Sequence, residues 1–481
     1  MKNEKYKRLF RFAAMIANTV FQVFCFYEIW LRYYNSRIDQ SFARRGNWLI
    51  AGLYLLVLLL FTHVYGGFKI GYQKPGSMAL SQALSLIGTN VFALVLTLLF
   101  SRNLLFAGKL TFLLPGPGSS GERVISILPY LALTAVQTLG TTGMAVLLTR
   151  IYDAVFPPRR LLMIYGEYEE AARTLAGKMN GMKEKYQIAG MVNQSLGQAV
   201  LQEQIPGYQG VVLLDVEAGL RNHLIKYCYG MAIRVYVAPN LTDIILGGAE
   251  KLHFFDSPLL LSRNSGLSIE QKLAKRVLDL VISGLGILIT APLMAVIALA
   301  IKIGDGGPVF FRQDRVTVGG RVFRITKFRS MVVDAEKAGY AIPATDRDPR
   351  ITPVGRVIRA TRMDELPQLF DIFRGDMSVV GPRPERVEHV EKYTESVPEF
   401  VYRLKIKGGL TGYAQIYGKY NTSAYDKLKL DLMYIENYSV LLDLKLILMT
   451  VKIMFTKEST EGFTEEKSAD MQEAMREKKG R

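Results

Sequence analysis

The sequence predicts a multi-domain membrane protein. It contains a four-helix transmembrane bundle, an α/β domain and an α+β domain anchored by a re-entrant membrane helix. Apolar residues make up 49% of the 481 residues, too many for a purely soluble protein, and 21% are charged, too many for a bare transporter. Long apolar runs also alternate with charged stretches along the chain. We place the domains at residues 1–156, 157–268, 269–302 and 303–456, followed by a charged, flexible tail at 457–481.

The composition excludes several classes of protein. The net charge is +17, and basic segments beside membrane spans are drawn to anionic lipid headgroups, so we expect membrane lipids and anionic substrates rather than nucleic acid. The only cysteines, Cys25 and Cys228, provide no disulfide framework. Four scattered histidines do not form the spacing of a zinc site.

Four apolar runs in the first third predict four membrane spans. They lie at 12–31, 48–65, 84–106 and 124–149, and each approaches or exceeds the roughly 17 to 25 residues that cross a bilayer as a helix. Four spans place both ends of the bundle on one side. Basic residues before the first span and after the fourth favour the cytoplasm for that side, whereas four arginines in the first loop argue for the opposite orientation.

The next stretch alternates in the manner of a small α/β domain. We expect buried strands at 160–165, 186–191, 210–215 and 233–238, with helices between them. A dinucleotide site needs a glycine-rich turn after the first strand, but Gly166 is followed by acidic residues that repel a pyrophosphate. We therefore expect a structural or assembly role for this domain, with a regulatory ligand as the alternative.

A fifth apolar run spans 280–301 and contains 22 uncharged residues, which is long enough for a transmembrane helix. Pro292 lies in its middle, where it removes a backbone donor and clashes with a preceding carbonyl, so the helix must kink or break. A helix that dips into the membrane and returns leaves both basic flanks on one face, and we favour this re-entrant arrangement. The alternative is a fifth, kinked span that would put the remaining chain on the far side.

A basic stretch follows this run, and phenylalanines are interleaved with its charges. The pattern predicts a half-buried ribbon against the headgroup layer, although such a run is also typical of a solvated face. Its cations are Arg312, Arg315, Arg321, Arg324, Lys327 and Arg329.

The adjacent carboxylates Asp364 and Glu365 precede an apolar pattern at 366–373 that has helical spacing. Negative charge is favoured at a helix N-terminus, so a simple cap explains an isolated pair. Here cations converge on the same region, and the sequence predicts a site where phosphate and a divalent metal meet. These cations are Arg356, Arg359 and Arg362 upstream, and Arg383 within Pro-Arg-Pro.

Ordered motifs surround this pair. They are Lys275-Arg276 with Asp279, Pro308–Gln313 with Arg315, Lys327–Met331, Gly355-Arg356 with Arg359, Asp364–Leu369, Gly375–Pro384 and Gly409–Gln415. On these motifs, residues 272–456 resemble the catalytic domain of the bacterial sugar transferases, which are monotopic polyprenyl-phosphate phosphoglycosyl transferases. The whole chain is similar to the large members, which add four spans and a Rossmann-like domain and start capsule, exopolysaccharide or O-antigen units.

The resemblance implies a reaction at the cytoplasmic face of the bacterial inner membrane. A sugar 1-phosphate moves from a UDP-sugar to undecaprenyl phosphate, and UMP is released. Asp364 is the implied nucleophile, which forms a phosphosugar-aspartyl intermediate. Glu365 is expected to help hold Mg²⁺.

The resemblance also implies roles for other side chains. Arg359 and Arg383 are expected to clamp phosphate, and Lys327 and Arg329 to orient it or contact it on the membrane side. We assign membrane insertion to Lys275, Arg276, Asp279 and Pro292.

The chain departs from the family pattern at several positions. Ala291-Pro292 stands where Ser-Pro is usual, and Tyr413 and Tyr417 replace the Trp and Asn often found in their loop, which bears on donor preference. Two alternatives remain open at this point: a catalytically inactive membrane assembly scaffold, and a polyprenyl glycosyltransferase that releases UDP. The sequence is compatible with a homodimer and does not name the sugar, for which glucose and galactose are the leading expectations from the resemblance.

Overall fold

The computed structural model describes residues 4–34, 43–69, 75–100, 127–182, 185–262, 266–333, 335, 348–418 and 422–454. The chain divides into two compact units, Met1–Ala238 and Pro239–Arg481. Within these described residues, five helices are long and apolar enough to cross a membrane, and each overlaps a predicted apolar run. The five segments are Tyr6–Tyr33, Trp48–Tyr65, Pro75–Leu98, Leu128–Val155 and Ile269–Asp305. The predicted ends at 101–106 and 124–126 lie outside the described residues.

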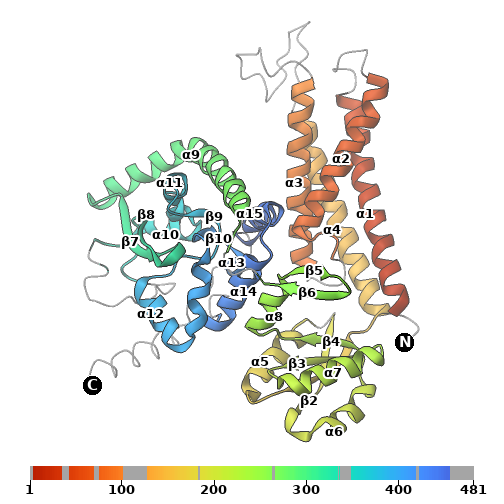
Figure 1. The fold of residues 1–481 in the computed structure, drawn as a ribbon. Coiled ribbons are helices and arrows are strands. Elements are labelled where there is room, and N and C mark those ends of the chain that lie inside the picture. The colour runs from red at the N-terminus through yellow and green to blue at the C-terminus, as the bar shows by residue number, and fades with distance from the viewer. Residues whose placement is uncertain are drawn as a thin grey trace, which may run out of the picture. The chain divides into compact units, whose positions relative to one another are not determined.

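The first four of these helices pack against one another (Figure 1). They are α1 (Glu4–Tyr33), α2 (Ala43–Tyr65), α3 (Pro75–Phe100) and α4 (Leu128–Val155). Buried polar side chains link them: Gln137 Nε2 donates to Gln22 O at 2.7 Å and to Tyr54 Oη at 3.0 Å. Asn90 Nδ2 donates to Gln137 Oε1 at 2.9 Å. Since buried polar groups are costly without partners, this mutual pairing favours one arrangement of the four helices.

A four-stranded parallel sheet follows, with strand order β2-β1-β3-β4. Its strands and helices lie close to the predicted segments. They are β1 (Arg159–Tyr165), α5 (Glu169–Asn180), β2 (Tyr186–Asn193), α6 (Gln198–Gln204), β3 (Gly210–Leu214), α7 (Ala218–Gly230) and β4 (Arg234–Val237). A Cβ added at Gly166 would lie 1.8 Å from Asp215 O, so the glycine permits close backbone packing after β1.

The second unit begins with three short elements that the sequence assigned to the preceding domain. They are α8 (Leu241–Gly247), β5 (Glu250–Phe254) and β6 (Ser257–Leu261), and the last two form an antiparallel pair. Ile244 and Leu267 are buried in the same core as Phe400 and Leu432. Residues 239–268 are therefore part of the second compact unit.

The fifth apolar helix, α9 (Ile269–Asp305), continues through Pro292 and is visibly bent (Figure 1). The predicted interruption is therefore not a break in this helix. Thr290 Oγ1 donates to Gly286 O at 2.7 Å, a bond from a side chain to the preceding turn that often accompanies a bend in a helix. The helix starts with a capping box at Ser268 and ends at Gly306, which has a φ of 71°.

After α9 the chain forms an antiparallel ribbon of β7 (Phe310–Val316) and β8 (Val322–Phe328). Phe323 and Phe328 are buried while Phe310 is exposed, so the ribbon is half-buried as predicted. Strands β9 (Ser378–Val380) and β10 (Gly409–Thr411) form a short parallel pair. The remaining elements are α10 (Pro353–Ala360), η5 (Met363–Glu365), α11 (Gln368–Arg374), β9 (Ser378–Val380), α12 (Val387–Ser396), η6 (Pro398–Lys405), β10 (Gly409–Thr411), α13 (Tyr413–Tyr417), α14 (Ala424–Glu436) and α15 (Val440–Met454).

Candidate active site

The acidic pair lies in the short 3₁₀ turn η5, between α10 and α11. The sequence placed both carboxylates at the start of the following helix, but α11 itself begins only at Gln368. Arg362 introduces the turn with a φ of 55°, a left-handed conformation that is uncommon for a residue other than glycine. Such a conformation persists where the surroundings enforce it, and it sets the direction in which the two carboxylates leave the backbone.

Helix α10 approaches the segment that follows β8 closely because of a glycine. A Cβ at Gly355 would lie 1.9 Å from Ser330 O, so no other residue fits without a shift. Thr352 caps this helix by accepting a hydrogen bond from Gly355 N at 2.9 Å. The end of the ribbon and the acidic turn are thereby brought to one place.

Glu365 is held by two cations from separate segments. Its Oε1 accepts hydrogen bonds from Lys327 Nζ at 2.9 Å and from Arg383 Nη2 at 2.7 Å. The Glu365 side chain is only 14% exposed. Burial alone would raise the pKa of this carboxyl, but the charges and hydrogen bonds of Arg383 and Lys327 hold it well below its usual range. Glu365 is therefore ionised at neutral pH.

Asp364 has a different environment from its neighbour. No described residue forms an ion pair with its carboxylate. Burial raises its pKa, and the adjacent Glu365 raises it further, while the charges of Lys327 and Arg359 oppose both effects. The carboxylate is thus partly desolvated and not neutralised by a direct partner, which are properties suited to a nucleophile.

The backbone carbonyls of the Pro382-Arg383-Pro384 segment accept hydrogen bonds that hold it in place. Arg403 Nη2 donates to Arg383 O at 2.9 Å, and Arg315 Nη1 donates to Pro384 O at 3.2 Å. Gly409 N donates to Pro382 O at 2.9 Å. These bonds orient the Arg383 side chain toward Glu365, because they fix the chain on both sides of it.

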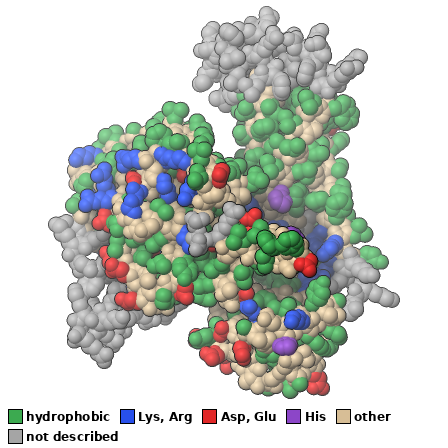
Figure 2. All heavy atoms as spheres, viewed as in Figure 1, with side chains coloured by type: hydrophobic (Ala, Val, Ile, Leu, Met, Phe, Trp, Pro, Cys, Tyr) green, Lys and Arg blue, Asp and Glu red, His purple; other side chains and the backbone are tan. Residues whose placement is uncertain are grey.

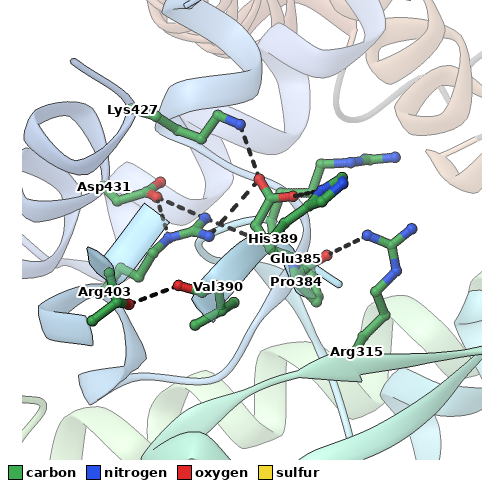
Figure 3. A network of polar contacts seen from close by, with 10 residues as sticks. Arg315, Pro384, Glu385, His389, Val390, Arg403, Lys427 and Asp431 are labelled. Carbon is green, nitrogen blue, oxygen red and sulfur yellow. Dashed lines mark hydrogen bonds and ion pairs between the residues drawn. The ribbon is translucent and has the colours of Figure 1, made fainter. Parts of the chain in front are cut away.

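A buried charged network lies behind this segment (Figure 3). Arg403 contacts Asp431 through Nε and Nη2, both at 2.8 Å, and the two side chains are 2% and 1% exposed. Lys427 Nζ donates to Glu385 Oε1 at 2.9 Å. Sequence reasoning missed Arg403 and Asp431, which are 28 positions apart and belong to no local pattern.

The remaining predicted site residues lie in several places. Arg359 is in the last turn of α10, close enough to influence Asp364 electrostatically. The buried Arg329 pairs instead with Asp305 at the end of α9, so the structure does not bring it to the acidic pair.

Three predicted membrane-insertion residues bind the second unit's own elements. Lys275 Nζ lies 2.7 Å from Asp443 Oδ2. Arg276 donates to the carbonyls of Ile372 and Phe373, both at 2.8 Å. Asp279 Oδ1 accepts from Ser378 Oγ at 2.9 Å and from Val379 N at 2.8 Å. The fourth, Pro292, lies in α9 and is exposed.

The oxygen atoms at the acidic pair bear on the magnesium ion that the resemblance implies. Among the described residues there is no cluster of three or more metal-binding side chains. Mg²⁺ often binds through one or two carboxylates together with substrate phosphates. Lys327 and Arg383 both donate to Oε1 of Glu365, and Oε2 has no hydrogen-bond partner among the described residues. The residues present therefore fit a magnesium ion that is shared with a phosphate ligand.

Known proteins are similar to this chain over the same segment. A family model for the bacterial sugar transferases matches residues 270–457. The chain is 40% identical over 211 residues to the UDP-glucose:undecaprenyl-phosphate glucose-1-phosphate transferase of Klebsiella pneumoniae, covering 43% of each protein. It is 36% identical over 245 residues to the UDP-N-acetylgalactosamine-undecaprenyl-phosphate N-acetylgalactosaminephosphotransferase of Aeromonas hydrophila, covering 50% of this chain and 57% of that protein.

The chain thus spans about half the length of these two relatives. A shorter relative is covered more fully: the UDP-glucose:undecaprenyl-phosphate glucose-1-phosphate transferase of Caulobacter vibrioides is 41% identical over 192 residues, which are 39% of this chain and 72% of that protein. The chain therefore belongs to the bacterial sugar transferase family.

Proposed function

We propose that this protein transfers a sugar 1-phosphate from a UDP-sugar to undecaprenyl phosphate, as the first membrane step of polysaccharide synthesis. One observation carries the proposal: Asp364 is partly buried, has no ion pair with a described residue, and lies beside Glu365, which is held by Lys327 and Arg383. The names of the relatives from Klebsiella and Aeromonas support the same chemistry.

In the first step, an Asp364 carboxylate oxygen attacks the phosphorus bonded to the sugar. A new bond forms between this oxygen and phosphorus, and the phosphorus–oxygen bond to UMP breaks, so UMP leaves with the bridging oxygen. Arg383 and Lys327 both pair with Glu365, the residue next to Asp364. From there their positive charges stabilise the negative charge on the phosphates.

In the second step, a phosphate oxygen of the lipid attacks the same phosphorus. The bond between phosphorus and Asp364 breaks, the free carboxylate returns, and undecaprenyl diphosphate-sugar is formed. A bound Mg²⁺ would neutralise charge on the diphosphate. Glu365 would hold it through Oε2, while Lys327 and Arg383 keep Oε1 in place.

We propose that α9 enters the membrane and returns on the same side. Its N-terminal half binds the second unit through Lys275 and Asp279, and its C-terminal half packs through Ile297 and Ile301 around the buried Phe328. Because both halves of α9 pack on the same compact unit, that unit can lie on one side of the bilayer.

The outer face of α9 supports the same proposal. Leu288 is 73% exposed and Ile289 is 74% exposed in the middle of the helix. Figure 2 shows that Lys and Arg side chains gather beside the apolar surface of the second unit. Apolar side chains at the level of the lipid tails with cations at the headgroups are typical of an interfacial anchor. The site would then face the cytoplasm at the inner membrane, within reach of both substrates.

The experiment is to incubate the purified full chain in detergent with undecaprenyl phosphate and UDP-glucose, UDP-galactose or UDP-N-acetylgalactosamine, and to identify the released nucleotide. We expect UMP and a lipid diphosphate-sugar from at least one donor. Release of UDP would instead indicate a glycosyltransferase that moves the sugar alone. No nucleotide release from any donor would support a scaffold without activity.

A further inference from the structure

A cavity of about 180 Å³ adjoins the acidic pair. Glu365 and Arg383 form part of its wall, and the other polar lining residues are Arg362, Thr411, Gln415 and Thr450. The rest of the wall is apolar and consists of Leu366, Leu369, Leu410, Ile416, Ile453 and Met454. Charged groups that handle phosphate therefore border a space lined mainly by hydrocarbon.

The cavity reaches the membrane-associated helix through one of its wall residues. Leu369 packs against α9 at Gly286, where an added Cβ would lie 3.2 Å from Leu369 Cδ1. The neighbouring residues of α9 are the exposed apolar side chains of its middle section, including Leu288 and Ile289. A lipid chain at this level would have a short apolar path to the cavity.

Gln415 supplies an independent sign of a ligand. Its Nε2 and Oε1 atoms are both buried and have no hydrogen-bond partner among the described residues. A buried amide without partners is costly, and such groups call for an explanation. A ligand that brings a polar atom into the cavity would satisfy at least one of them.

We propose that this cavity binds the phosphate-proximal isoprenoid unit of the acceptor lipid, with Gln415 Nε2 donating to a lipid phosphate oxygen. The inference rests on the proposed function and assigns the acceptor a location within it. An apolar cavity of about 150 Å³ can hold a benzene ring, so the volume of this cavity is sufficient for a five-carbon isoprenoid unit.

The alternative occupant is the sugar of the donor. A hydroxyl-rich sugar would place several hydroxyls against the six apolar side chains, where they would remain unpaired. An isoprenoid unit gains from the same surfaces by leaving water. The lining therefore favours the lipid.

The test fills the cavity with Ile453→Trp and compares it with Val451→Trp, an exposed position on the same helix that does not line the cavity. The first half-reaction is measured without lipid, as exchange of labelled UMP into UDP-sugar. The second is measured as transfer to undecaprenyl phosphate in mixed micelles. We expect Ile453→Trp to raise the KM for the lipid at least tenfold and to leave the exchange rate within twofold of the wild type. Val451→Trp should leave both unchanged.

Gln415→Leu provides a second test. The two side chains are similar in size, so this substitution changes the volume of the cavity little. It should raise the KM for undecaprenyl phosphate about tenfold or more, with the UMP exchange retained, because a hydrogen bond to a charged phosphate is lost. A higher KM for the UDP-sugar in either variant would assign the cavity to the donor and overturn the proposal, as would an unchanged lipid KM in both. Failure of the wild type to exchange UMP would instead refute the proposed function.

Discussion

Substitution of Lys275 by Met tests how α9 is anchored. Lys275 Nζ lies 2.7 Å from Asp443 Oδ2 and 2.9 Å from Tyr434 Oη. The lysine and aspartate side chains are 6% and 1% exposed, so Lys275→Met leaves a buried charge without its cation. Breaking a buried ion pair costs about 3–5 kcal/mol. Tyr434 still donates to Asp443 Oδ1 at 2.6 Å, which favours the lower end of that range.

The loss of about 3 kcal/mol corresponds to a drop in Tm of roughly 6–12 °C for a unit of this size, at about 2–4 °C per kcal/mol. Differential scanning calorimetry of the full chain in detergent would measure the transition of the second unit. The only tryptophans, Trp30 and Trp48, belong to the first unit, so their fluorescence should report an unchanged transition there. Lys272→Met, at an exposed position on the same helix, is the matched control.

The double variant Lys275→Met, Asp443→Asn removes both charges and should recover most of the lost stability. We expect a coupling energy of at least about 2 kcal/mol in the double-mutant cycle. Additive effects of the two substitutions, or a Tm shift of Lys275→Met no larger than that of Lys272→Met, would refute the anchoring role of this pair.

Three further predictions concern the site. Arg403→Lys should lower kcat/KM at least about tenfold, with a raised KM for the UDP-sugar, because a lysine cannot make both contacts with Asp431 and still bond Arg383 O; steady-state kinetics would measure this. The pKa of Glu385 lies below its usual range, despite burial, because of His389, Lys427 and Arg403. The stability it contributes is therefore present above about pH 4.5 and lost as the pH falls further, and Glu385→Gln should flatten the fall in Tm between pH 5 and pH 3. Removal of divalent ions with EDTA should abolish transfer, and added Mg²⁺ should restore it; activity that persists in EDTA would exclude the magnesium role.

Local patterns predicted the regular elements well. The four strands of the parallel sheet form close to the predicted runs. The central strands β1 and β3 are buried as predicted, whereas β2 and β4 have no buried residue because they lie at the edges of the sheet. The acidic pair was also evident, because Asp364 and Glu365 stand before a helical pattern among several arginines. In each case the signal is contained within a few consecutive residues.

Interactions between distant segments could not be predicted in this way. Arg403 contacts Asp431, and Ile244 is buried in the core of the second unit. Both contacts join segments that are far apart in the sequence, so no local pattern of residues predicts them. Arg329 looks like Lys327 in sequence, but it lies just beyond the end of β8 and pairs with Asp305, whereas Lys327 reaches Glu365. Pro292 indicated an interruption, yet a helix can continue past a proline when it bends.

The central claim is that Asp364 becomes bonded to phosphorus during turnover. The most direct measurement is mass spectrometry of wild-type enzyme that is mixed with UDP-glucose, or with whichever donor is active, in the absence of lipid and then quenched and digested. We predict a sugar-phosphate adduct on the peptide that contains Asp364, which disappears when undecaprenyl phosphate is added and is absent from Asp364→Asn. An enzyme that turns over without this adduct, or an Asp364→Asn variant with near-normal transfer, would contradict the account.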